Sequence, residues 1–145
     1  MAEKKKAPQV ALVEAFLQRL IDADVDAIAD ILTEDAVFEF PFAPEGQPKA
    51  IKGRDGIAAY FRKTFPKKRI TAVTRCLTYE MADPSTVFQE FDCALLDVET
   101  GARHDNNYCA LYDLRDGKIA LFREYYNSVV RQQKEGVHPT LKAVS

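Results

Sequence analysis

The sequence has few histidines, no paired-cysteine motif and no glycine-rich phosphate loop. Its two histidines, His104 and His138, lie far apart and belong to no HExxH or Cys/His ligand pattern, so no metal site is predicted. The usual signals of nucleotide binding and of covalent acyl transfer are also missing, including the GxSxG motif. No cofactor is expected, and the chemistry that remains is proton transfer or simple binding.

Long apolar runs and an excess of positive charge are missing as well. The longest nearly apolar runs, such as Ala94-Leu95-Leu96, fall far short of the roughly 20 residues of a membrane span. The 20 Lys plus Arg against 22 Asp plus Glu give a net charge of -2, without the basic footprint that nucleic-acid binding usually requires. Neither a membrane nor a nucleic acid is therefore an expected partner.

Cysteine usage and the first residues bear on the compartment. Cys76, Cys93 and Cys109 form no CxxC pair, and their odd number favours buried thiols over a disulfide framework. The chain begins with a lysine-containing segment that lacks the apolar stretch and cleavage site of a signal peptide. We therefore expect a cytoplasmic protein.

Length and composition are those of one globular domain. The chain has 145 residues, of which 47% are hydrophobic, and such a chain can bury a core and is not intrinsically disordered. One domain is predicted over 1–145, with a solvated tail over 1–7 and a C-terminal surface extension over 129–145.

Helices are predicted in the first half of the chain. Apolar residues recur at helical spacing after Pro8, and Asp24 is a suitable N-cap for a second helix that carries Ile28, Ile31 and Leu32. Pro66 ends a third helix because its ring cannot continue one. The predicted order is a helix after Pro8, a helix after Asp24, a strand over 36–40, a loop over 41–48 and a helix from Gly53 to Pro66.

Strands are predicted in the second half, where short turn signals separate long runs of strand-like residues. These strands cover 69–81, 86–98, 103–114 and 118–128. Helices that precede a curved antiparallel sheet can cover only one of its faces. The predicted fold class is therefore α+β, a cone-shaped half-barrel with three N-terminal helices packed on a mostly antiparallel sheet.

Glu124 is the main candidate for chemistry. Strand alternation puts Glu124 on one face with Phe122 and Tyr126, and Arg123 and Tyr125 on the other. On a concave face, desolvation raises the pKa of a carboxyl group toward the range of a general acid or base at neutral pH. The alternative is a carboxylate that faces solvent or pairs with an arginine, and alternation alone does not choose between them.

Further candidates lie on the neighbouring predicted strands and on the helices. Asp92 could project into a cavity, although alternation favours a solvated face opposite Phe91 and Cys93. Asn106 and Tyr108 share a face and could bind an oxygen atom of a ligand, or the tyrosine could simply belong to the core. Most of the aromatic residues are interpreted as core residues, and some as residues that line a pocket. The candidates for ligand binding are Phe16, Phe40, Tyr60, Phe61, Phe122 and Tyr126.

The chain resembles the SnoaL-like branch of the nuclear-transport-factor-2-like superfamily over 8–128. The resemblance lies in the order of the elements and in two segments, Gly53-Arg54-Asp55-Gly56-Ile57 and 116–127. Asp83-Pro84, Asp105-Asn106-Asn107-Tyr108 and the ending at Asn127 are most similar to the phenazine-biosynthesis A/B-type proteins. The resemblance implies a cone-shaped barrel, a homodimer formed through the outer sheet face, and a deep hydrophobic pocket for a small, often ring-shaped molecule. It also implies that Glu124 points inward.

The resemblance also implies which reactions fit. In the phenazine-type proteins the glutamate that matches Glu124 does acid/base work on ketones, but the helping histidine expected within 69–81 is absent. Ketosteroid isomerase uses a tyrosine and an aspartate where this chain has Phe16 and Phe40, which disfavours steroid isomerisation. Limonene-epoxide hydrolase has an arginine and an aspartate where Phe91 and Cys93 stand, so epoxide hydrolysis is a minor alternative.

The resulting hypothesis is a SnoaL-like protein that binds a small hydrophobic, cyclic metabolite. Glu124, with Asp92 as a second candidate, would carry acid/base catalysis of the isomerase, cyclase or condensation type. Asn106 and Tyr108 would orient oxygen. The alternative is a binding or dimerisation module without catalysis, because one fold hosts both kinds of function.

Overall fold

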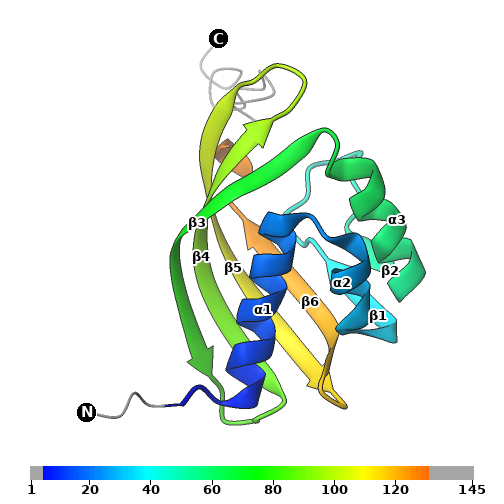
Figure 1. The fold of residues 1–145 in the computed structure, drawn as a ribbon, viewed down its shortest axis with the longest axis vertical. Helices are drawn as coiled ribbons and strands as arrows, with labels where there is room; N and C mark the ends of the chain where they lie inside the picture. The colour runs from blue at the N-terminus through cyan, green and yellow to red at the C-terminus, as the bar shows by residue number, and fades with distance from the viewer. Residues whose placement is uncertain (1–4, 131–145) are drawn as a thin grey trace.

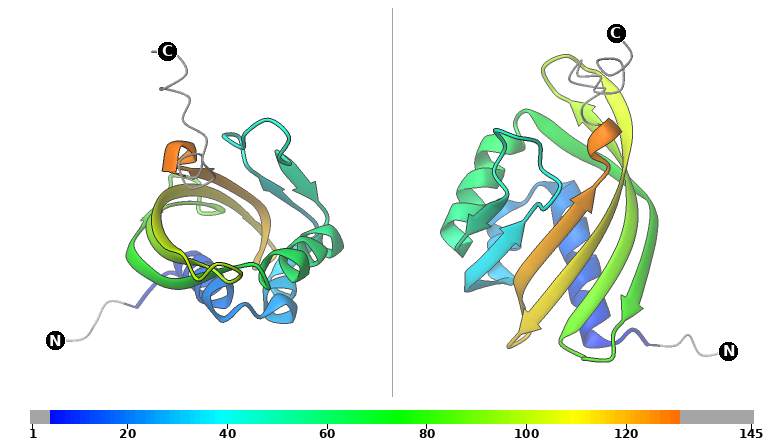
Figure 2. Two further views of the ribbon diagram at one scale, coloured as in Figure 1. Left: turned by 90° about the horizontal axis from the view of Figure 1, so that it is seen from above. Right: turned by 180° about the vertical axis from the view of Figure 1, so that it is seen from behind.

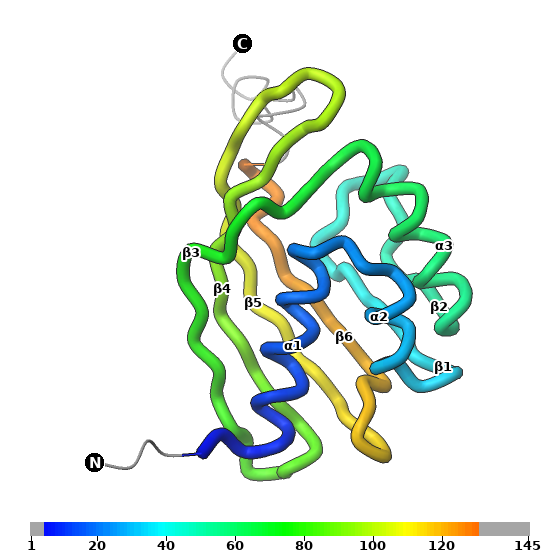
Figure 3. The backbone as a smooth tube through the Cα atoms, viewed as in Figure 1, coloured from blue at the N-terminus to red at the C-terminus, as the bar shows by residue number. Residues whose placement is uncertain are grey.

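The computed structural model describes residues 5–130, which form a strongly curved sheet with helices packed against its concave side (Figures 1 and 2). The sheet has six strands in the order β2-β1-β6-β5-β4-β3. Neighbouring strands are antiparallel except β1 and β6, which run parallel side by side (Figure 3). The elements are α1 (Pro8–Asp22), α2 (Val25–Asp30), β1 (Leu32–Glu39), β2 (Ala50–Lys52), α3 (Arg54–Thr64), β3 (Lys68–Glu80), β4 (Thr86–Asp97), β5 (Arg103–Arg115) and β6 (Lys118–Tyr126). The predicted α+β class and half-barrel are confirmed.

Local sequence signals account for the ends of several elements. Pro8 occupies the first turn of α1, where its missing N–H is harmless. The Asp24 carboxylate accepts a hydrogen bond from the Ala27 N–H at 3.1 Å and so caps α2. Asp116 and Gly117 both have positive φ, at 54° and 72°, as a tight turn between β5 and β6 requires. The four long strands begin and end within two residues of the predicted limits.

Two features of the first half differ from the prediction. The second helix ends at Asp30, and Leu32 begins β1 instead, because the Ile119 N–H donates to the Ile31 carbonyl and draws this segment into the sheet. The short strand β2 was not predicted; it pairs with the end of β1 after the proline-rich loop. The first pairing joins residues 88 positions apart, and the second spans the loop over 40–49, so local propensity does not reveal either of them.

The N- and C-terminal predictions fall partly outside the described residues. Residues 5–7 precede α1 without regular structure, and residues 128–130 are helical after β6. The rest of the predicted tail over 1–7 and of the extension over 129–145 lies outside the described range.

Four aromatic rings form a layer across the concave face, hereafter the Phe16 layer: Phe16, Phe38, Tyr112 and Phe122. The Phe16 ring lies edge-on against Phe38, Tyr112 and Phe122, with centroids 5.8, 6.0 and 5.1 Å away. All four side chains are buried. Because α1, β1, β5 and β6 each contribute one ring, this layer joins the helix to three strands of the sheet.

Replacing Phe16 by alanine should lower the free energy of unfolding by about 3 to 5 kcal/mol, because it leaves a cavity among well-packed rings. Urea unfolding followed by circular dichroism measures the change. The matched control is Phe42→Ala, since Phe42 is 57% exposed and should lose less than about 1 kcal/mol. Equal losses in the two variants would contradict the central position of the Phe16 layer.

Candidate functional site

Two adjoining cavities lie in the concave side of the sheet beyond the Phe16 layer. One, of about 290 Å³, is lined by polar as well as apolar side chains and is called the polar cavity. The other, of about 140 Å³, is lined mainly by phenylalanine and aliphatic side chains and is called the apolar cavity. Seven residues line both and thus mark where the two meet: Phe40, Tyr60, Thr64, Lys68, Leu95, Tyr108 and Glu124.

Strand alternation explains which side chains reach the cavities. On β6, Phe122 packs against Phe16, and the next two inner side chains, Glu124 and Tyr126, line the polar cavity. On β5, the inner residues beyond Tyr112 and buried Ala110 are Tyr108, Asn106 and His104, and these three line it too. Glu124, Asn106 and Tyr108 therefore lie on the concave face of the sheet.

Helix α3 and the loop after β1 form the opposite wall. Tyr60 and Thr64 from α3 line both cavities, and Phe61 lines the apolar cavity. Phe40 comes from the end of β1, and Ala43, Gln47 and Pro48 come from the proline-rich loop. The candidates Phe40, Tyr60, Phe61, Phe122 and Tyr126 thus lie at one site, together with Glu124, Asn106 and Tyr108.

The charge of Glu124 acts on neighbouring groups inside the sheet. Glu124 pairs in register with Ala110 on β5, one inner position from Tyr112. Burial, and after it the negative charge of Glu124, raises the pKa of the Tyr112 hydroxyl well above its ordinary value. The same two causes raise the pKa of the Cys93 thiol to about 12, so this thiol in the apolar cavity is uncharged at neutral pH.

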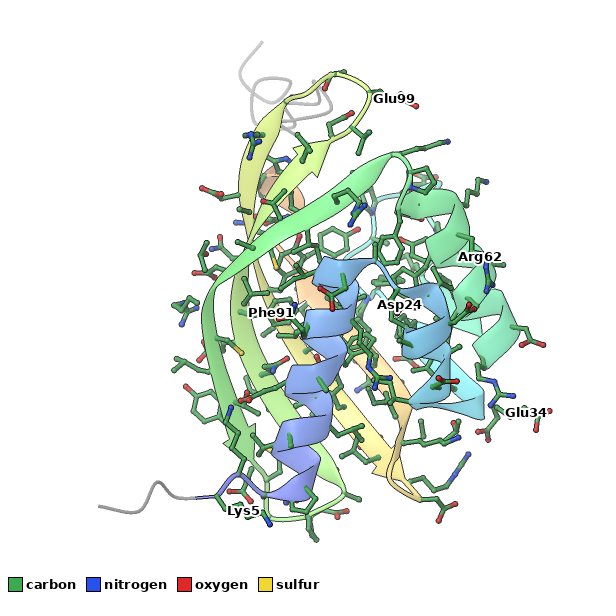
Figure 4. All side chains as sticks on the ribbon, viewed as in Figure 1. Lys5, Asp24, Glu34, Arg62, Phe91 and Glu99 are labelled. Carbon is green, nitrogen blue, oxygen red and sulfur yellow. The ribbon has the colours of Figure 1, made fainter. Side chains whose placement is uncertain are left out.

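Asp92 does not belong to the site, which corrects its nomination as a catalytic residue. Phe91 and Cys93 are buried on the inner face of β4, and Figure 4 shows Phe91 on the side of the sheet that faces α1. Asp92 therefore projects from the opposite face, where its carboxylate accepts from Arg75 Nε at 3.0 Å and from Asn107 Nδ2 at 3.2 Å. These two hydrogen bonds lower its pKa and keep it ionised.

Phe16 is also corrected, from ligand-binding residue to core residue. Its side chain has no exposed surface, and the residues that line the two cavities do not include it. The reason is that α1 presses this ring onto Phe38, Tyr112 and Phe122, which fills the concave face at that level.

Sequence reasoning missed three charged or titratable residues at the site. His104 was weighed only as a metal ligand, although alternation from Asn106 places it on the inner face of β5. Lys68 lines both cavities, and β3 begins at this residue, one position earlier than predicted. Arg69, the next residue, lines the apolar cavity and could not be assigned by alternation because Lys68 and Ile70 line it as well.

The described residues contain neither a metal-binding cluster nor a membrane-spanning helix. Within 5–130 no group of three or more His, Cys, Asp or Glu side chains is arranged to hold a metal ion. No helix in this range is long and apolar enough to cross a membrane. The expectation that the protein uses no cofactor stays a prediction.

A family model described as a SnoaL-like domain matches residues 13–122. The chain belongs to the SnoaL-like family. It is 35% identical over 137 residues to the uncharacterized protein YesE of Bacillus subtilis, which covers 94% of this chain and 91% of that protein. It is 32% identical over 111 residues to an uncharacterized PhzA/B-like protein of Pseudomonas aeruginosa, covering 77% of this chain and 78% of that one.

Solved structures share the SnoaL-like fold. A Bacillus subtilis protein provisionally named an isomerase has a TM-score of 0.82 at 31% identity, covering 90% of this chain and 94% of that one. An epoxide hydrolase of M. tuberculosis, described as LEH-like, has a TM-score of 0.67 at 24% identity and covers 87% of each chain. At that identity the second likeness is one of fold alone. The predicted resemblance to the SnoaL-like and nuclear-transport-factor-2-like proteins is confirmed.

The three thiols should differ in reactivity because only one is exposed. Cys76 is exposed, Cys109 is half-buried and Cys93 is buried with a pKa of about 12. Since the thiolate is the reactive form, Ellman's reagent at pH 8 should label Cys76 first and Cys93 last. Cys76→Ser should remove the fast phase, and the matched variant Cys93→Ser should keep it. Loss of the fast phase in Cys93→Ser would contradict the burial of Cys93 in the apolar cavity.

Proposed function

We propose that this SnoaL-like protein binds a small, mostly hydrophobic cyclic metabolite in the two cavities, and that Glu124 transfers a proton at a carbon next to a carbonyl group. One observation carries the proposal: the side chain of Glu124 lines both cavities, at the junction of the polar and the apolar one. A ring held in the apolar cavity would therefore present its edge to the carboxylate. The reaction is of the isomerase, cyclase or condensation type and needs no cofactor.

The neighbours of Glu124 suit this chemistry. As a general base, the carboxylate takes a proton from carbon, and the electron pair moves onto the carbonyl oxygen as an enolate. The Asn106 amide and the Tyr108 hydroxyl share the concave face with Glu124 and offer hydrogen bonds to that oxygen. The rings of Phe40, Phe61 and Phe122 line the apolar cavity and exclude water from the reacting carbon.

The comparisons support a reaction of the isomerase type without naming a substrate. One relative is called PhzA/B-like, and one similar structure is provisionally named an isomerase. Epoxide hydrolysis is not proposed. Phe91 and Cys93 face the apolar cavity, and Asp92 faces outward, so the arginine and aspartate of that chemistry have no counterpart here.

A binding module without catalysis is the second candidate. The observation that favours it is the apolar character of the two positions that match the ketosteroid isomerase pair, since Phe16 is core and Phe40 lines the cavities. Such a module would bind the same small hydrophobic molecule, and Glu124 would contribute to affinity only. Turnover, or its absence, distinguishes the two candidates.

We also propose that the protein is a homodimer formed through the outer sheet face. Leu77 and Tyr79 on β3 are large apolar side chains that remain 44% and 43% exposed. Phe88 on β4 pairs in register with Tyr79 and with Leu111 on β5, so apolar side chains continue across this face. A second copy would cover them, as the hydrophobic effect favours.

The three free thiols support the expected cytoplasmic location, because a reducing compartment keeps cysteines unpaired.

Glu124→Gln should abolish turnover while ligand binding survives. Substrates are sought by a thermal-shift screen of cyclic ketones and aromatic ring compounds, where a ligand at 100 times its Kd adds about 2.7 kcal/mol of stability. Loss of a general base lowers kcat about 10²- to 10⁴-fold. The matched control is Glu34→Gln, since Glu34 is exposed on β1 and points away from the sheet (Figure 4). Undiminished turnover in Glu124→Gln would refute the catalytic assignment, and binding without any turnover would favour the binding module.

Leu77→Glu should convert the dimer into a monomer, because a charge would be buried in the contact without a partner. Size-exclusion chromatography with light scattering measures the mass over a dilution series, and dissociation should begin at a concentration at least about tenfold higher than in the parent protein. Val98→Glu is the matched control, since Val98 is 46% exposed at the β4–β5 turn, eight residues along the chain from Glu90, which pairs with Leu77. A parent protein that is monomeric at all concentrations would refute the dimer.

A further inference from the structure

The first residues of β3 bring two positive charges to the cavities. Lys68 lines both cavities, and Arg69 lines the apolar one. The acidic side chain that lines them is Glu124, so among the described lining residues cations outnumber carboxylates by two to one. Lys68 pairs in register with Asp97 of β4, so Arg69 is the cation on which a ligand site can rest.

Arg69 has an unused donor at a fixed position. Its Nη2 donates to the carbonyl oxygen of Ile21 in the last turn of α1, at 3.4 Å, where the helix dipole favours a positive charge. Its Nε atom is buried and has no hydrogen-bond partner among the described residues. A buried donor without an acceptor is destabilising, and a guanidinium group binds carboxylates through two parallel donors. The acceptor missing here is one that a bound anion would supply.

The walls of the apolar cavity are suited to a flat ring. The Phe61 and Phe65 rings stack with centroids 4.9 Å apart and planes 10° from parallel. The Phe91 and Tyr108 rings stack in the same way, at 5.0 Å and 10°. All four residues line the apolar cavity. Stacked pairs present flat ring faces and edges, and a planar ligand packs on them with more contact than a puckered one.

We propose that the ligand is a planar cyclic carboxylate, whose ring lies in the apolar cavity and whose carboxylate binds Arg69. This deepens the proposed function and rests on it, since it names the class of molecule on which Glu124 would act. It also assigns Arg69 as a specificity-determining residue, which rejects the neutral analogue of the same shape. Arg69 on β3 and Glu124 on β6 are separated by β5 and β4 in the sheet, so a carboxylate bound to Arg69 would be held apart from the Glu124 carboxylate.

The test compares 2-naphthoate with its neutral isostere 2-naphthamide by isothermal titration calorimetry on the full chain. The parent protein should bind the acid at least about tenfold more tightly than the amide, as a charge-assisted hydrogen bond predicts. Arg69→Gln should weaken binding of the acid about tenfold or more and leave binding of the amide within about twofold. The matched control is Arg62→Gln, since Arg62 pairs with Asp26 at the surface and lines neither cavity.

The outcomes separate this inference from the function on which it rests. Equal binding of acid and amide overturns the anion preference and leaves a cavity for neutral rings, as the proposed function allows. A preference that survives in Arg69→Gln overturns the role of Arg69. Binding of neither probe at 1 mM overturns the inference, while the Glu124→Gln comparison still decides the proposed function on its own. If Arg69→Gln does not fold, Arg69→Lys replaces it: this variant keeps the charge, lacks Nε, and should still weaken binding of the acid selectively.

Discussion

The contact of Phe16 with Phe38, Tyr112 and Phe122 divides the concave face of the sheet into a filled part and a hollow part. On one side of this layer α1 packs directly on the strands. On the other side α1 continues only as far as Asp22, with Leu20 in the wall of the apolar cavity, and α3 with the loop after β1 forms the opposite wall. On β5 and β6 the inner side chains beyond buried Ala110 and Phe122 therefore line a cavity. The site follows from this geometry, because the alternation that buries Phe122 also turns Glu124 toward the cavity.

A buried polar chain holds the filled part in place. The Tyr112 hydroxyl donates to Gln89 Oε1 at 2.8 Å, Gln89 Nε2 donates to Thr78 Oγ1 at 3.1 Å, and Thr78 donates to Glu14 on α1 at 3.3 Å. Gln89 has no exposed surface, so its amide would be destabilising without these partners. The chain crosses from β5 through β4 and β3 to α1. Because hydrogen bonds are directional, they orient α1 on the sheet in addition to the packing of its apolar side chains. The orientation of α1 in turn sets the position of the Phe16 layer.

Much of this arrangement could be predicted from the sequence, and the limits have physical causes. Alternation grouped Asn106 with Tyr108, and Glu124 with Phe122 and Tyr126, because residues two apart in a strand share a face. The choice of the concave face for Glu124 came from the family resemblance. Alternation also favoured an outer position for Asp92, and its nomination as catalytic ignored that. The parallel pairing of β1 with β6 and the lining role of Arg69 depend on contacts between distant segments, and no local pattern encodes them.

The charge of the site depends on which of its titratable groups stay uncharged at neutral pH. Burial and the charge of Glu124 both raise the pKa values of Cys93 and Tyr112, so neither adds a second negative charge beside the carboxylate. Lys68 and Arg69 enter from the edge strand β3, where the sheet meets the C-terminal end of α1. In the proposed function, the specificity of a fold shared by many chemistries comes from a few positions: one acid on β6, a cation at the start of β3, and neutral groups between them.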